Sequence, residues 1–124
     1  MEIKIEGDPI PASRPRFSGR RAYRPKRDVE YREVVQRAAI AAMDGAPPLT
    51  GAVAATVRLF RRFKPTARNF GDVDNHAKAI LDALNGICYK DDSQVTSCTV
   101  TKSKDAACPR TEIELVAVSV DRKE

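Results

Sequence analysis

Four aspartates and a lysine lie close together in the middle of a chain that is otherwise rich in basic residues. Asp72 and Asp74 are two residues apart, Lys78 follows four residues later, and Asp91 and Asp92 form a second acidic pair. Carboxylates that are brought close together repel one another. A hard cation such as Mg²⁺ or Mn²⁺ offsets that repulsion and takes oxygen ligands. The spacing therefore indicates a site for a divalent metal ion.

Each of these residues also has a structural explanation. An aspartate before a helix commonly caps free backbone N–H groups, and an aspartate in a turn commonly stabilises the turn. Lys78 would lie one helical turn after Asp74 and one turn before Asp82, where it would form surface ion pairs. A lone histidine such as His76 is more often a packed or exposed residue than a metal ligand. On the residues alone, both interpretations stay open.

Two segments rich in arginine and lysine precede the acidic residues. Residues 13–27 contain seven basic side chains, two aromatic residues and no acidic residue. Arginine binds phosphate oxygens and an aromatic ring stacks on a base or sugar, so the composition favours nucleic-acid contact over a merely solvated loop. Proline and glycine interrupt the segment, which predicts an extended loop without regular structure. The predicted DNA-binding residues are Arg14, Arg16, Arg20, Arg21, Arg24, Lys26, Arg61, Arg62, Lys64 and Arg68.

Length and composition exclude several classes of protein. The 124 residues are 42% hydrophobic and 31% charged, with a formal net charge of +5, which is typical of one globular domain spanning residues 1–124. The positive charge favours a polyanionic partner. No apolar run is long enough to span a membrane and no secretory leader is visible, so we expect a cytoplasmic protein. The three cysteines match no zinc pattern, and Cys88 is expected in the core.

Hydrophobic periodicity predicts the elements that hold these residues. Alternation of apolar and polar residues predicts strands at residues 1–6, 52–63, 95–102 and 111–120, of which the last two would form a terminal hairpin. Helical spacing predicts one helix from Asp28 to Met43, capped by Asp28, and a second from about Asp74 that ends before Gly86. This order predicts an α+β fold, a small mixed sheet with helices on one or both faces.

One stretch of the sequence resembles a known family. DVDNHAKAILDALNGICYKDDSQV, from Asp72 to Val95, is similar to the signature of the RusA family of Holliday junction resolvases. PIPASRPRF, followed by RAYRPK ahead of the first predicted helix, resembles the N-terminal part of the same family, so the likeness extends over most of the chain. Members are small homodimeric endodeoxyribonucleases, commonly carried by phages and prophages.

The resemblance implies roles for particular residues. Asp72, Asp74 and Asp92 would be catalytic metal-binding carboxylates and Lys78 the catalytic lysine, with Asn75 and Asp91 supporting them. It further implies Mg²⁺, with Mn²⁺ as a substitute, four-way junction DNA as substrate and a homodimer, with no membrane and no nucleotide cofactor. The alternatives are a non-catalytic module that binds branched DNA and a nuclease acting on other branched DNA. His76 stands where the family often has an aliphatic residue, and its role is left open.

Overall fold

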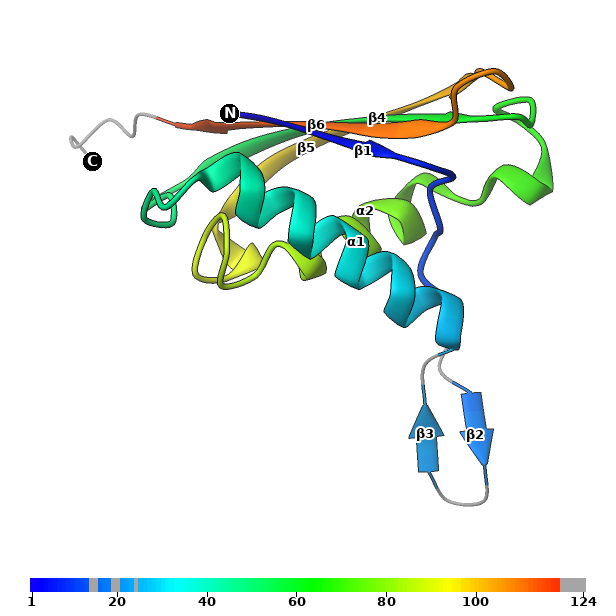
Figure 1. Ribbon diagram of the computed structural model, residues 1–124, viewed down its shortest axis with the longest axis horizontal. Helices are drawn as coiled ribbons and strands as arrows, with labels where there is room; N and C mark the ends of the chain where they lie inside the picture. The colour runs from blue at the N-terminus through cyan, green and yellow to red at the C-terminus, as the bar shows by residue number, and fades with distance from the viewer. Residues whose placement is uncertain (14–15, 19–20, 24, 119–124) are drawn as a thin grey trace.

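The protein is a mixed four-stranded sheet with two helices packed against one of its faces (Figure 1). The computed structural model describes residues 1–13, 16–18, 21–23 and 25–118, with the backbone alone for 16–18 and 21–23. The main elements are β1 Glu2–Glu6, α1 Lys26–Met43, β4 Val53–Arg61, α2 Val73–Ala83, β5 Val95–Lys104 and β6 Arg110–Ala117. The α+β class predicted from the sequence is confirmed.

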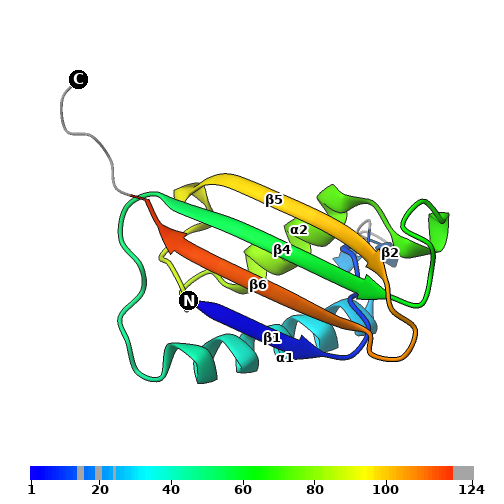
Figure 2. The same ribbon diagram turned by 90° about the horizontal axis from the view of Figure 1, so that it is seen from above.

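The strands are ordered β1-β6-β4-β5 across the sheet (Figure 2). β4 runs parallel to β5 and antiparallel to β6, and β6 is antiparallel to β1. The predicted terminal hairpin of β5 and β6 is therefore wrong. Parallel neighbours require a crossover connection, and α2 provides the one between β4 and β5. β6 pairs with the other edge of β4, between β4 and β1.

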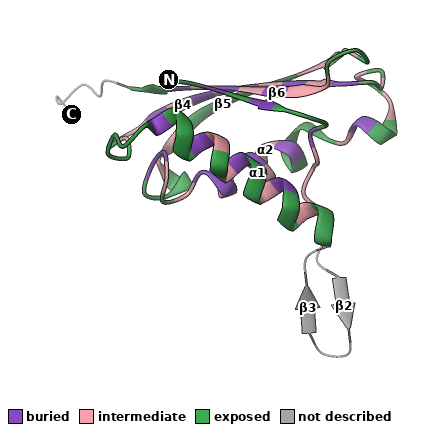
Figure 3. Ribbon diagram, viewed as in Figure 1, coloured by how far each residue is buried: buried purple, intermediate pink, exposed green. Residues whose placement is uncertain are grey.

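The core lies between the helices and the inner face of the sheet (Figure 3). Every second residue of β4 is buried, as the pleat of a strand covered on one face requires. On the helices, the buried residues recur at helical spacing: Tyr31, Val35, Ala39 and Met43 on α1, and His76, Ile80 and Ala83 on α2. Cys88 is buried as expected, and burial raises the pKa of its thiol to about 11. No helix in the described ranges has the length and apolarity to cross a membrane.

The basic N-terminal segment differs from the prediction. Residues expected to lack regular structure form a short hairpin of β2, Arg16–Ser18, and β3, Arg21–Tyr23. It projects from the N-terminal end of α1, away from the sheet (Figure 1). Phe17 of β2 and Tyr23 of β3 are of residue types enriched in strands, so the two short strands violate no local preference.

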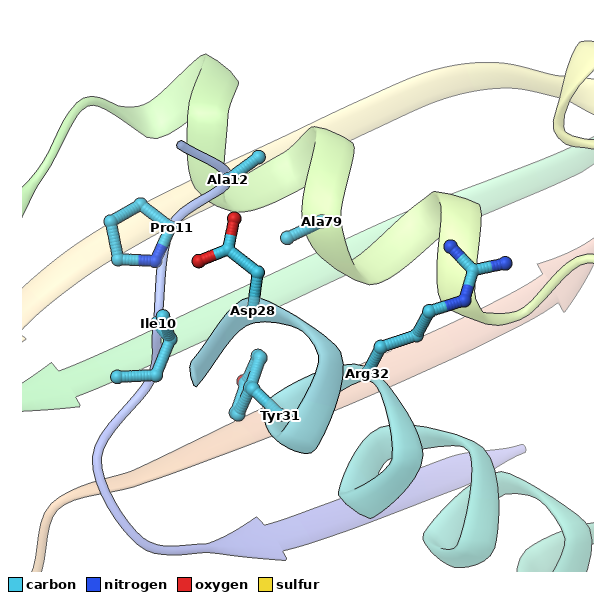
Figure 4. Close-up of a pocket in the computed structure, with 7 residues that line it drawn as sticks. All are labelled: Ile10, Pro11, Ala12, Asp28, Tyr31, Arg32 and Ala79. Carbon is cyan, nitrogen blue, oxygen red and sulfur yellow. The ribbon is translucent and has the colours of Figure 1, made fainter. Parts of the chain in front are cut away.

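Asp28 does not cap α1, which begins two residues earlier with Pro25 at the N-cap position. Its carboxylate instead accepts hydrogen bonds from the backbone N–H of Ser13 at 2.9 Å and from the Ser13 hydroxyl at 3.2 Å. Figure 4 shows Asp28 beside Pro11 and Ala12, across a pocket of about 10 Å³ that has room for about one water molecule. Asp28 therefore anchors the chain just ahead of the basic hairpin.

Candidate active site

Asp72 and Asp74 lie at the N-terminus of α2 with exposed side chains. Asp72 occupies the N-cap position, with φ −77° and ψ 146°, but its carboxylate accepts no capping hydrogen bond. Within the part of the chain that the structure describes, the Asp74 carboxylate accepts a single hydrogen bond, from the backbone N–H of Asn75 to Oδ1, at 3.0 Å. The capping explanation therefore fails for Asp72, and both carboxylates are open to a ligand beside the positive end of the helix dipole.

Lys78 is exposed one helical turn after Asp74, on the same side of α2. Among the described residues it forms no ion pair, and the surface pairs with Asp74 and Asp82 that the spacing allowed are absent. Asp82 pairs instead with Arg32 of α1, which ties the two helices together. The ammonium group of Lys78 is thus available at the acidic end of α2.

The second acidic pair contains two different kinds of carboxylate. A short 3₁₀ helix, Asp92–Gln94, follows Asp91, whose side chain accepts the backbone N–H of Ser93 at 2.9 Å. Hydrogen bonding by Ser93 lowers the pKa of Asp91. Asp92 is exposed, and its carboxylate accepts no hydrogen bond from the described part of the chain. Asp91 therefore stabilises the turn, and Asp92 is the member of the pair that is free to bind a ligand.

Gln94 holds this turn in place. Its Oε1 accepts the backbone N–H groups of Lys90 and Asp91, at 2.9 Å and 3.2 Å, and its Nε2 donates to the carbonyl oxygens of Leu49 and Gly51, both at 2.9 Å. All four contacts are to backbone, so the side chain fixes the turn against the segment that leads into β4. Sequence reasoning gave Gln94 no role, although its position three residues after Asp91 is that of a capping box.

The two acidic groups lie at opposite ends of α2. Asp72 precedes the first residue of the helix, where Lys102 near the end of β5 bonds Gly71. Asp92 lies in the turn before β5, which Gln94 bonds to Leu49 and Gly51 at the start of β4. The 11 helical residues of α2 span about 16 Å. Among the described residues, no group of three histidine, cysteine, aspartate or glutamate side chains is close enough to hold one metal ion. The structure therefore brings Asp72 and Asp74 together and leaves Asp92 of the same chain apart from them.

Arg61 was predicted to contact DNA, and the structure corrects this prediction. Its side chain is only 8% exposed, because it continues the buried side of β4, and it forms a two-pronged ion pair with Asp8 at 2.9 Å and 2.7 Å. Its Nη1 donates to the carbonyl oxygens of Asn69 at 3.1 Å and Phe70 at 2.7 Å. Arg61 therefore supports the backbone ahead of the first aspartate. The alternation from Val53 onward already placed it on the inner face.

His76 is fully buried and contacts the same stretch of backbone. Its Nε2 donates to the Phe70 carbonyl oxygen at 2.7 Å, and the two rings pack edge to face with centroids 5.9 Å apart. Burial lowers the pKa of His76, which favours the neutral ring. A neutral imidazole that donates from Nε2 to a carbonyl, inside the core, positions the backbone and is unsuited to bind a solvent-exposed metal ion.

The other nine predicted DNA-binding residues lie in the loop before α2, at the start of α1 and in the basic N-terminal segment. Arg62, Lys64 and Arg68 are exposed on the loop between β4 and α2. Lys26 is exposed at the start of α1, 3.9 Å from Glu30. Of the rest, Arg16 and Arg21 lie on the strands of the hairpin with their backbone alone described, and Arg14, Arg20 and Arg24 lie outside the described residues.

Comparison with known proteins identifies the family of the chain. Residues 6–116 match the protein family described as endodeoxyribonuclease RusA. A protein of Bacillus subtilis (strain 168), called uncharacterized protein YqaN, is 30% identical over an alignment that covers 96% of this chain and 97% of that protein. The match spans nearly all of the chain and includes both acidic groups, the lysine and the basic loop, so this protein belongs to the RusA family of endodeoxyribonucleases.

Proposed function

We propose that this protein is a Mg²⁺-dependent endonuclease that resolves four-way DNA junctions by paired nicking, as a homodimer in the cytoplasm, in recombination and repair. The observation that carries the proposal is the pair of carboxylates, Asp72 and Asp74, at the N-terminus of α2, in a chain of an endodeoxyribonuclease family. Asp72 accepts no capping hydrogen bond, and Asp74 uses one oxygen for the backbone N–H of Asn75, so capping accounts for only one of the four carboxylate oxygens.

The donor set suits a hard divalent cation. Asp72, Asp74 and Asp92 offer exposed carboxylate oxygens, which Mg²⁺ and Mn²⁺ prefer, and these three residues would hold the ion. A divalent ion supplies Lewis-acid assistance to phosphodiester hydrolysis, which leaves a 5′-phosphate and a 3′-hydroxyl. Lys78 would stabilise the negative charge that develops on a phosphate oxygen, and the backbone N–H of Asn75 orients the Asp74 carboxylate.

The distance along α2 gives the proposed homodimer a chemical role. One chain presents Asp72 and Asp74 at one end of the helix and Asp92 at the other, so a complete set of three requires a second source for Asp92. A twofold dimer in which the N-terminal end of one α2 meets the Asp92 turn of its partner would form two equivalent sites. Two sites related by symmetry would then cut two opposed strands.

Substitution of single carboxylates tests the proposal. Asp72→Asn, Asp74→Asn and Asp92→Asn should each abolish Mg²⁺-dependent nicking of a synthetic four-way junction, while binding persists because a negative charge is removed. Asp91→Asn is the matched control and should keep most of the cleavage, since Asp91 serves the turn. Undiminished cleavage in the first three variants would refute the site. A panel of four-way junctions, flaps, duplex and single strands would separate junction resolution from other branched-DNA cleavage and from metal-independent binding.

A mixed dimer extends the same experiment to the shared site. Asp72→Asn chains and Asp92→Asn chains are inactive separately, but a heterodimer of the two, purified with different tags, would have one site with both substitutions and one intact site. We expect this heterodimer to nick one strand of each junction. If all three carboxylates came from one chain, both sites would be broken and no nick would form.

A further inference from the structure

The backbone just before Asp72 is held by cationic side chains from two strands of the sheet. Arg61 at the end of β4 bonds the carbonyl oxygens of Asn69 and Phe70, as described above. The next carbonyl, that of Gly71, accepts a hydrogen bond from Nζ of Lys102 on β5 at 3.0 Å. Three successive carbonyl groups that lead into the site are therefore fixed by side chains, and Lys102 holds the last of them.

The position of Lys102 on β5 directs its side chain toward this carbonyl group. It pairs in register with Leu59 of β4, so it lies on the face of the sheet that the helices cover. Its Nζ also lies 5.1 Å from the centre of the Phe70 ring, a distance at which a cation is attracted to the ring face. The ammonium group is thus bracketed by an aromatic ring and a carbonyl oxygen, and its side chain is half-buried.

The Gly71 carbonyl matters because of the peptide unit to which it belongs. A peptide unit is planar and extends from the Cα of Gly71 to the Cα of Asp72, so fixing its oxygen fixes the plane from which the Asp72 side chain projects. Gly71 has a φ of +93° and no side chain to restrict rotation. Without the hydrogen bond from Lys102, this peptide would be less restrained than the two peptides before it, whose carbonyl oxygens Arg61 holds.

We propose that Lys102 is a positioning residue of the nuclease site, which holds the Gly71–Asp72 peptide and thereby keeps the Asp72 carboxylate in the orientation that binds the divalent ion. The inference rests on the proposed metal-dependent function. It differs from a direct role in DNA binding, because the group that Lys102 contacts is the protein backbone.

The direction in which metal affinity changes when Lys102 is replaced distinguishes a positioning role from a purely electrostatic effect of its charge. Loss of a lysine near a cation site reduces repulsion of the ion and should tighten metal binding, whereas loss of a positioning contact should weaken it. Lys102→Met keeps the aliphatic stem and removes the donor, and Lys102→Arg keeps a cationic donor. Lys104→Met removes the same charge two residues along the same face of β5, at a side chain that makes no hydrogen bond or ion pair to the described residues.

The experiment is a titration of the full-length protein with Mn²⁺, in which free Mn²⁺ is followed by electron paramagnetic resonance without DNA. We expect about a 10-fold weaker affinity for Lys102→Met, the size typical of groups that orient metal ligands, with Lys102→Arg and Lys104→Met close to the wild type. In metal-free buffer, Lys102→Met should bind the junction no more weakly than Lys104→Met, which loses the same charge on the same strand, and the Mg²⁺ concentration for half-maximal cleavage should rise only for Lys102→Met. Thermal unfolding checks that each variant is folded.

Several outcomes would overturn the inference. These are Mn²⁺ affinity in Lys102→Met that equals or exceeds that of the wild type, failure of Lys102→Arg to restore it, or weaker junction binding with unaltered metal affinity. A wild-type protein without Mn²⁺ affinity would overturn the inference and the proposed function together. A wild-type protein that binds Mn²⁺ but cuts no junction would refute the proposed function alone and leave the role of Lys102 intact.

Discussion

Gly71 is the residue on which the geometry of the candidate site depends most directly. Its φ of +93° lies in a region that residues with a side chain rarely adopt, and a Cβ there would stand 2.9 Å from Nε2 of His76 and 2.9 Å from Cγ of Pro11. His76 is buried and bonded to Phe70, and the chain next to Pro11 is held by a hydrogen bond of 3.0 Å from the Ala12 N–H to the Asn75 carbonyl. Only glycine therefore allows the chain to pass between them and enter α2.

We expect Gly71→Ala to lower the free energy of unfolding by about 3 kcal/mol or more, as the sum of backbone strain and overpacking. Gly86→Ala is the matched control, because Gly86 also has a positive φ, +78°, but no atom lies within 4 Å of a Cβ built there. It should lose about 1 to 2 kcal/mol from strain alone. Urea unfolding measures both values. Equal losses would mean that contacts of the added Cβ at position 71 with His76 and Pro11 do not contribute to the destabilisation.

At this scale the sequence supplied candidates for the chemistry, but it did not indicate the residues that hold those candidates in place. Asp72, Asp74 and Asp92 were chosen from residue type and spacing. The structure gives Asp72 and Asp92 no capping hydrogen bond, whereas Asp74 accepts the backbone N–H of Asn75. The contacts of Lys102 with Gly71 and of Gln94 with Leu49 join residues more than 30 positions apart, so no local pattern could indicate them.

The two helices are joined to the sheet by a small number of polar contacts within a mainly apolar interface. Tyr31 of α1 and Thr111 of β6 share a buried hydrogen bond between their hydroxyl groups, at 2.9 Å. Burial raises the pKa of Tyr31 to about 12, from an ordinary value of 10.0. The neutral phenol is therefore favoured in the folded protein, and ionisation is easier after unfolding.

This difference predicts a dependence of stability on pH. The contribution of the neutral Tyr31 is fully present below pH 10, the unfolded pKa, and is lost as the pH rises toward the folded value of about 12. At 1.36 kcal/mol per unit of pKa, the loss approaches about 3 kcal/mol. Tyr31→Phe has no group to ionise, and it should be about 1 kcal/mol less stable than the wild type at pH 8 because Thr111 loses its partner.

The two stability curves should therefore cross at about pH 11, where the loss has reached about 1 kcal/mol, with Tyr31→Phe the more stable protein at the highest pH. Urea unfolding of both proteins at intervals from pH 8 to pH 12 measures the difference, and all other ionising groups are common to the pair. A difference that stays constant over this range would contradict the buried, neutral state of Tyr31.

Elements with strong hydrophobic periodicity were predicted from the sequence, whereas the pairing of the strands was not. The alternation of β4 and the apolar side of α2 gave these elements close to their observed bounds. The partner of β5 could not be read from its own residues, because strands that follow one another usually pair, and here α2 places β5 beside β4. One signal was available: β5 is rich in serine, threonine and lysine and β6 is more apolar, as an edge strand and a central strand should be.

At the scale of the whole molecule, the open face of the sheet and the loop between β4 and α2 carry different charge. The face without helices bears four acidic residues on β1 and β6 and three basic residues, two of which are occupied by ion pairs, Arg58 with Glu114 and Arg110 with Glu112. The exposed basic residues of the loop between β4 and α2 lie instead next to Asp72 in the chain. DNA, as a polyanion, should therefore approach the end of the molecule where α2 begins and avoid the open face of the sheet.

Two lysines of equal charge test this orientation. Lys64 is exposed on the loop before α2, and Lys4 is exposed on the open face of the sheet. Each phosphate contact contributes about 0.9 to the slope of log affinity against log salt, because binding releases counterions from DNA. Lys64→Gln should therefore weaken junction binding and reduce this slope by about 1, whereas Lys4→Gln should leave both close to wild-type values. Fluorescence anisotropy with a labelled four-way junction at four or five salt concentrations gives the slopes, and equal effects of the two substitutions would mean that DNA is attracted by net charge alone, without a preferred face.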